Sequence, residues 1–279
     1  IPVARIGQQG ALHDVAAIGR EGPGEEAVRH LPGVRLVCPP AAEAVPGAAV
    51  PGQDRAAEAD PVLVLHHRRQ EAAVLVQLAL EEKDLPYQLR LLPPLTGKHA
   101  SPELLTKNPR GTFPVLVDGA ETVVESSIII EHLELNHPGA RPLLPRDPKQ
   151  ALPVRAMDRF FDNYVMTPMM RIVFDRIRAE ADRDPVGVAE ARALLDTAYQ
   201  WLDGQLGSRQ WACEGDFSMA DCSAAPSLFY ADWVHEIDAA FANTRAYRAR
   251  LLARPSVARA VEAARPYRHL FPLGAPDRD

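Results

Sequence analysis

The sequence predicts an α/β domain followed by an all-helical domain. Three observations lead to this fold class. Short apolar runs alternate with helical patterns over residues 61–137, four prolines interrupt residues 138–150, and apolar residues recur at helical spacing over residues 151–279. We therefore expect domains at 61–137 and 151–279 joined by a linker at 138–150, and a chain of 279 residues has room for both.

The first 60 residues differ from the rest of the chain. Ala, Gly and Pro account for 28 of them, and the segment contains no Phe, Tyr or Trp. Such a composition buries too little apolar surface to offset a backbone ordering cost of roughly 1–2 kcal/mol per residue. We expect residues 1–60 to be a disordered, low-complexity leader or a wrongly assigned start of the protein.

The α/β domain begins with a strand, a helix and a second strand. Val62–Leu65 is a short continuous apolar run, which is typical of a strand buried on both faces. Residues 72–83 place apolar side chains on one helical face, and Tyr87–Leu91 alternates as a strand does. Strand, helix and strand within about 30 residues form a βαβ unit with a right-handed crossover.

A short helix over residues 101–107 leads to a hairpin and a last helix. The apolar runs 114–117 and 121–124 are separated by an Asp-Gly turn, which is a strong hairpin signal. Residues 126–136 then form a helix that ends before Pro138. The resulting order, β-α-β-α-β-β-α, is the thioredoxin-like arrangement.

Two long amphipathic helices are expected beyond the linker. Residues 155–178 carry one broad apolar stripe, and Pro168 within it predicts a kink. Residues 190–206 repeat the helical pattern. The second domain is therefore predicted to be a helical bundle.

Composition excludes several classes of protein. A formal charge of −6 offers no basic footprint for nucleic acid, and no apolar run reaches the roughly 18 residues of a membrane span. Cys38, Cys213 and Cys222 form no CxxC pair and have no histidine at zinc-ligand spacing, so we expect no metal. Free thiols and the lack of a signal-peptide pattern indicate a cytoplasmic protein. The excess of Arg over Lys is typical of a GC-rich bacterial genome.

Three separated motifs carry a family resemblance. Asn108–Leu116 (NPRGTFPVL) precedes the hairpin, Glu125–Ile129 (ESSII) follows it, and Phe217–Asp221 (FSMAD) comes much later. In this order and spacing they resemble the cytosolic glutathione S-transferase superfamily over residues 61–271. The Thr96–His99 loop and the Leu65–His67 strand end are most similar to tetrachlorohydroquinone-dehalogenase-like bacterial members.

The resemblance implies a thioredoxin-like glutathione-binding domain, then a helical bundle, with glutathione as co-substrate and a homodimer. It also implies a cis peptide bond before Pro114 and a Thr112–Phe113 backbone that faces the tripeptide. Ser126 and the free N–H groups of its helix would bind the γ-glutamyl carboxylate, because helix N-termini favour anions. Glu125 would accept a hydrogen bond from the α-amino group. The plainer interpretation of Glu125 and Ser126 is an N-terminal helix cap.

Lys98 and His99 lie in the loop where family members hold the glycyl carboxylate. A cationic donor suits that task, and His99 matches the family position best. The alternative is a solvated loop charge.

The segment that should activate the thiol departs from the family pattern. A free thiol with a pKa of about 8.5 is mostly protonated at neutral pH. The family overcomes this with a Ser or Tyr hydroxyl, or uses a Cys, between the first strand and first helix, but residues 66–73 contain none of these. Gln70 or Arg68 can stabilise a thiolate electrostatically, or His67 can act as a base. The remaining alternative is a site that binds glutathione and catalyses little.

Tyr164, Met166 and Met169 are candidates for the pocket of the electrophilic second substrate. Flexible Met side chains suit adaptable apolar pockets. The alternative, which the helical stripe favours, is that these residues belong to the core.

Ser218 and Asp221 have the spacing of a capping box in which Asp replaces the usual Glu. We assign this pair to folding and not to chemistry. Loss of Asp221 is predicted to cost about 0.5–2 kcal/mol of stability.

Taken with the resemblance, these features predict a glutathione-dependent detoxification enzyme. It would conjugate glutathione to a small hydrophobic electrophile or remove halide from it, with neither nucleic acid nor membrane as a partner. The alternative is a glutathione-binding, transferase-like protein with weak or no catalysis.

Overall fold

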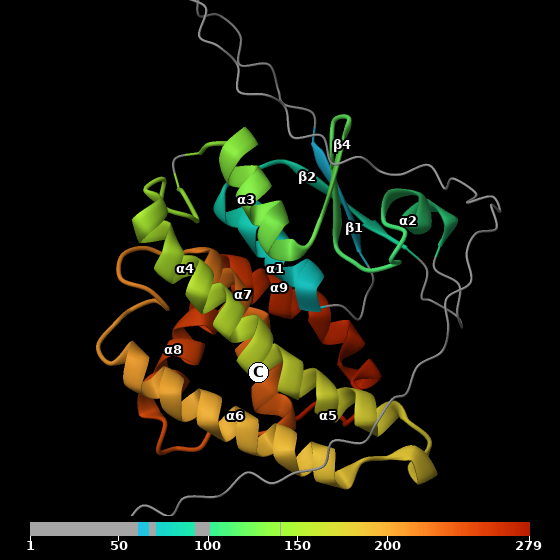
Figure 1. The fold of residues 1–279 in the computed structure, drawn as a ribbon, viewed down its shortest axis with the longest axis vertical. Coiled ribbons are helices and arrows are strands. Elements are labelled where there is room, and N and C mark those ends of the chain that lie inside the picture. Colours follow the sequence, from blue (N-terminus) through green and yellow to red (C-terminus); the bar gives the residue numbers. More distant parts are fainter. Residues whose placement is uncertain (1–60, 67–70, 93–100, 140) are drawn as a thin grey trace, which may run out of the picture. The chain divides into compact units, whose positions relative to one another are not determined.

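The computed structural model describes residues 61–66, 71–92, 101–139 and 141–279, and Figure 1 shows how their helices and strands are arranged. The leader at 1–60 and the segments 67–70 and 93–100 lie outside the described residues. Within the described part of the chain, no helix is both long and apolar enough to cross a bilayer.

A four-stranded mixed sheet is the centre of the first domain, with the strand order β2-β1-β3-β4. β1 (Val62–His66) pairs in parallel with β2 (Tyr87–Leu91). β3 (Val115–Asp118) runs antiparallel to β1, and β4 (Glu121–Val124) completes the predicted hairpin. The parallel pair confirms the βαβ unit.

Helices cover both faces of this sheet (Figure 1). On one face, α1 (Glu71–Glu82) and α3 (Ser126–Asn136) pack against Val64 and its neighbours. On the other face, Leu104 of α2 (Pro102–Lys107) packs against Leu65. Burial on both faces is what the continuous apolar pattern of β1 predicts, and the thioredoxin-like order is confirmed.

Within the residues described, all the regular secondary structure of the second domain is helical. Its elements are α4 (Pro148–Phe160), a π-helical segment η1 (Phe161–Met166), α5 (Thr167–Ile177), a short 3₁₀ turn η2 (Glu180–Asp182), α6 (Pro185–Leu206), α7 (Met219–Val234), α8 (Ala242–Ala253), α9 (Pro255–Ala264) and a second 3₁₀ segment η3 (Arg265–Leu270). α7 is buried along nearly its whole length and packs against α1, α4, α5 and α8.

The expected kinked helix over residues 155–178 is three segments in the structure. It starts earlier, at Pro148, and the π-helical segment η1 precedes Pro168. Pro168 lacks an N–H group, so it cannot donate the helical hydrogen bond to the carbonyl oxygen of Tyr164. Widening the turn lets both the N–H and the hydroxyl of Thr167 bond to the carbonyl oxygen of Asp162, the hydroxyl at 2.9 Å.

The helix expected over residues 190–206 also starts earlier. α6 begins at Pro185, because the side chain of Asp184 accepts a 2.8 Å hydrogen bond from the N–H of Gly187 and proline suits a first helical turn.

One hydrophobic core joins the two domains. Leu75, Leu78 and Ala79 of α1 belong to the same buried cluster as Leu228 of α7. The face of α1 that points away from the sheet is therefore part of the helical domain's interior, where α1 packs against α7 and α9.

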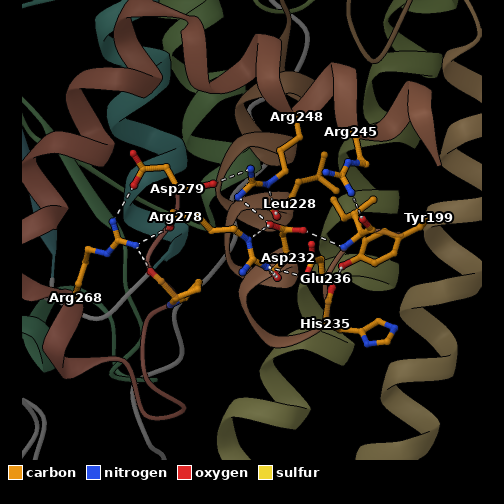
Figure 2. Close-up of polar contacts among 12 residues, drawn as sticks. Tyr199, Leu228, Asp232, His235, Glu236, Arg245, Arg248, Arg268, Arg278 and Asp279 are labelled. Atoms are coloured by element: carbon orange, nitrogen blue, oxygen red, sulfur yellow. Dashed lines mark hydrogen bonds and ion pairs between the residues drawn. The ribbon is translucent and has the colours of Figure 1, made fainter. Parts of the chain in front are cut away.

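The segment after α9 folds back onto α7 and α8 through charged pairs, as Figure 2 shows. Nη2 of Arg248 lies 3.2 Å from Oδ2 of Asp232, and Nε of Arg278 lies 3.5 Å from the same oxygen. Arg268 pairs with Asp279 at 2.9 Å. Burial lowers the pKa of Arg248, although Asp232 opposes the shift.

Candidate functional site

A cleft of about 510 Å³ opens where the sheet domain meets the helical domain. Four parts of the chain line it: the loop before β3, the start of α3, one side of α4 continuing into η1, and the first residue of α7. The described lining residues are Thr112, Phe113, Pro114, Glu125, Ser126, Ser127, Ile128, Glu131, Arg155, Asp158, Arg159, Asp162 and Met219.

The loop before β3 is held by Asn108. Its buried side-chain amide donates to both the carbonyl and the hydroxyl oxygen of Thr112, each at 2.8 Å, and Gly111 turns the chain with a φ of 67°. Phe113 is buried beside Leu65 in the core of the sheet domain. The Phe113–Pro114 peptide bond is cis, as the resemblance implied.

The N-terminus of α3 faces the same cleft. The described residues supply no side-chain cap for its first N–H groups, so these groups can bind an anion. Glu125, the residue before the helix, has a φ of 71°, which is uncommon for a residue other than glycine and typical of functional sites. Its carboxylate lies 3.0 Å from the guanidinium of Arg110. Sequence reasoning singled out both Glu125 and Ser126, and both border the cleft.

α4 forms the opposite wall through residues that the sequence did not single out. Asp158 is 1% exposed, and its carboxylate accepts from the hydroxyls of Ser127 at 2.8 Å and Ser223 at 2.6 Å. Arg159 donates to Asp158, to Ser127 at 2.8 Å and to Asp162 at 2.8 Å. This network ties α3, α4 and α7 together at the base of the cleft.

Both arginines of this wall are paired with carboxylates. Burial acts to lower the pKa of Arg159, but Asp158 and Asp162 outweigh it and raise the value. Arg155 makes a two-pronged ion pair with Glu131, both distances being 2.8 Å, and its hydrogen bonds lower the pKa of Glu131. Residues 155, 158, 159 and 162 recur at helical spacing, which is the one sequence signal that could have indicated a common face.

Five candidate residues lie outside the described part of the chain. They are Lys98 and His99, expected to hold the glycyl carboxylate, and His67, Arg68 and Gln70, expected to act on the thiol. Their roles remain predictions.

The three candidates for the electrophile pocket differ in how deeply they are buried. Met169 is fully buried in the core, Met166 is half-buried and packs against that core, and Tyr164 is exposed on η1. None of the three is among the described residues that line the cleft. For Met169, burial agrees with the alternative that it is a core residue.

Comparison with known proteins gives matches to both domains. Residues 71–141 match the family model of the glutathione S-transferase N-terminal domain, and residues 185–250 match that of the C-terminal domain. Glutathione S-transferase-like protein LUC7 of Fusarium is 31% identical over 57% of this chain and 70% of its own length. FtsZ-localized protein A of Caulobacter vibrioides is 30% identical over 62% of this chain and 78% of its own.

A solved structure is similar over the same region. A glutathione S-transferase from Methylobacterium radiotolerans, in complex with glutathione sulfonate, is 30% identical, with a TM-score of 0.64 over 72% of this chain and 94% of its own. The expected closeness to tetrachlorohydroquinone-dehalogenase-like proteins has only weak support. Glutathione S-transferase TCHQD of Arabidopsis thaliana is 38% identical, but over 26% of its length.

Proposed function

Because the chain belongs to the glutathione S-transferase superfamily, we propose that it is a cytoplasmic enzyme that conjugates glutathione to a small hydrophobic electrophile or removes halide from one. The observation that carries the proposal is that the Thr112–Pro114 loop and the N-terminus of α3 line one cleft. Both parts belong to the motifs through which the sequence resembles the family.

The binding mode follows from the chemistry of the cleft walls. The γ-glutamyl carboxylate would accept from the hydroxyl of Ser126 and from the first N–H groups of α3, where the helix dipole favours an anion. Glu125 would accept from the α-amino group, and the backbone beside Phe113 would pair with the middle of the tripeptide. Lys98 and His99 would hold the glycyl carboxylate.

The Ser126 contact is open to a direct test. Substitution Ser126→Ala should weaken glutathione binding about 10-fold or more, since a hydrogen bond to a charged group contributes about 1.5–3 kcal/mol. Titration calorimetry on the full chain measures this, with Ser208→Ala, at an exposed loop position, as the matched control. If the unsubstituted chain, Ser126→Ala and Ser208→Ala all bind glutathione with equal affinity, Ser126 is excluded from the binding site.

Thiol activation would rest on Gln70, Arg68 and His67, because the segment before α1 contains no Ser, Tyr or Cys. A pH titration of the ultraviolet thiolate absorbance of bound glutathione tests it. A midpoint well below the free-thiol pKa of about 8.5 is expected. A midpoint that stays at the free-thiol value, with binding confirmed by heat, would contradict the proposed chemistry.

The alternative function is glutathione binding with little catalysis. The name of one relative, FtsZ-localized protein A, describes a location and not a reaction. The substitution Gln70→Ser separates the two functions. A large gain in turnover would mean that the natural site lacks a group that activates the thiol. Little change or a loss would mean that Gln70 or its neighbours already activate the thiol.

A homodimer completes the proposal. Ile128 and Leu135 are exposed on α3 at i and i+7, and Glu131 between them pairs with Arg155 of α4. Leu152 of α4 is 65% exposed. An apolar face of this kind, crossing two adjacent helices, supports association with a second copy of the chain.

A further inference from the structure

Two histidines converge on one carboxylate oxygen at the end of α3 remote from the cleft. Nε2 of His132 lies 2.8 Å from Oδ2 of Asp118, and Nε2 of His137 lies 2.7 Å from the same oxygen. With one ligand atom taken from each residue, the three atoms all lie within 4.8 Å of one another. We call this group the Asp118 cluster.

Regular structure holds each of the three residues. Asp118 ends β3 and pairs with Glu121 across the hairpin. His132 lies in the second half of α3, and His137 caps the end of that helix, its N–H bonding to the carbonyl oxygen of Leu133 at 3.0 Å. The cluster therefore joins the hairpin turn to the C-terminal end of α3.

The surroundings suit an ion that exchanges with solvent. The three side chains are between 10% and 21% exposed, so they are shielded yet reachable. On the other side of the His132 ring, Nδ1 lies 3.0 Å from the side-chain nitrogen of Asn136 and 3.5 Å from Oε2 of Glu121. A carboxylate beside the second ring nitrogen orients a metal-bound imidazole and makes it a stronger ligand.

The donor set favours a borderline transition metal. Imidazole nitrogen and carboxylate oxygen bind Zn²⁺, whereas Ca²⁺ and Mg²⁺ prefer sets made wholly of oxygen. In a tetrahedral zinc site, ligand atoms about 2.0–2.1 Å from the ion lie roughly 3.3 Å apart. The two distances from Asp118 to the histidines, 2.8 and 2.7 Å, need to lengthen by about half an ångström to reach that spacing, and the ligand nitrogens of the two histidines lie within 4.8 Å of each other.

We propose that Asp118, His132 and His137 bind a zinc ion, with solvent as the fourth ligand and Glu121 orienting His132. The bound ion would link the β3–β4 hairpin to α3 and stabilise the folded chain. This site is separate from the glutathione cleft, and the proposal does not depend on the proposed transferase activity. The competing interpretation is a cluster held by hydrogen bonds alone.

Titration of the untagged full chain with zinc chloride tests the proposal. Calorimetry in a non-chelating buffer should give one ion bound at this site, and Co²⁺ should give the visible absorption of a low-coordinate His-carboxylate site. The substitutions His132→Gln, His137→Gln and Asp118→Asn should each weaken binding more than about 100-fold, beyond the 10–100-fold typical of second-shell changes. Glu121→Gln should weaken it about 10-fold.

The matched control is His235→Gln. His235 also pairs with a carboxylate, Asp196, at 2.7 Å, but no third ligand of this kind accompanies it among the described residues. The control should bind zinc as the unsubstituted chain does. Circular dichroism of each variant without metal shows whether it folds. If the histidine variants do not fold, Asp118→Asn provides the test, because asparagine keeps a hydrogen-bonding side chain at position 118. If the folded cluster variants bind zinc as tightly as the control, or if the unsubstituted chain binds none at about 100 μM, the proposal is wrong.

Discussion

Four donors converge on the buried carboxylate of Asp221. The N–H of Ser218 donates at 2.9 Å, as the capping box predicts, and the pair forms that motif. The hydroxyl of Ser218 also donates to Asp221, at 2.9 Å. The N–H of Ala212 donates at 2.9 Å, and the hydroxyl of Tyr247 donates at 2.6 Å. Burial raises the pKa of Asp221, while these donors act in the opposite direction.

The extra donors change the expected cost of losing this side chain. The value of about 0.5–2 kcal/mol expected from the sequence covers a helix cap alone. Each further buried donor left unpaired costs about 1–3 kcal/mol, so Asp221→Ala should lower the free energy of unfolding by about 3 kcal/mol or more. Urea unfolding measures this, with exposed Asp216→Ala as the control. A loss of less than about 1 kcal/mol would mean that water replaces the missing acceptor.

At the scale of elements, the end of α1 is tied to α9 by a buried ion pair. Glu82 is 7% exposed and accepts from Arg254 at 2.7 and 2.6 Å and from the hydroxyl of Ser256 at 2.5 Å. Arg254 also stacks on the ring of Phe217, 3.9 Å from its centroid. Burial acts to raise the pKa of Glu82, but the hydrogen bonds from Arg254 and Ser256 outweigh it, so the pKa is lowered.

This pair makes stability depend on pH in a defined direction. A lowered folded-state pKa contributes stability that is complete above the ordinary value of 4.5 and is lost as the pH falls through the folded value. Glu82→Gln should therefore destabilise the protein by about 3 kcal/mol at pH 7, and the difference should shrink below pH 4.5. Denaturant unfolding at several pH values measures it, with exposed Glu214→Gln as the control. A difference that is the same at pH 3 and pH 7 would rule out this linkage.

For the whole molecule, the testable quantity is the assembly state. Light scattering of the full chain should give twice the mass of one chain. Replacing Leu135 and Leu152 together with Glu should give a monomer that remains folded, because both side chains are exposed in the single chain. Leu194→Glu places the same charge on exposed α6 and should leave the dimer intact. A single-chain mass for the unsubstituted protein would contradict the proposed homodimer.

Local patterns in the sequence determined the order and the approximate bounds of the elements. Apolar periodicity located β1, α1 and β2, and the Asp-Gly turn located the β3–β4 hairpin. Two of the three motifs placed Phe113, Pro114, Glu125 and Ser126 at one site. These predictions succeed because a residue's spacing within one element, or its turn preference, is set by its immediate neighbours. The starts predicted for α4 and α6 were too late, although the sequence holds a local signal for each. Asp147-Pro148 and Asp184-Pro185 mark the true starts, and in both the Asp side chain caps the helix.

Only the tertiary structure decided which elements share a site. Asp158 meets Ser127 and Ser223 across 31 and 65 positions, Asp221 meets Tyr247 across 26, and Asp118 meets His132 and His137 across 14 and 19. Periodicity tells which face of a helix is buried, but it does not tell which partner covers that face or at what height along it. That height is set by close packing of side chains from several elements at once, so the α4 wall of the cleft and the Asp118 cluster emerge only from the folded chain.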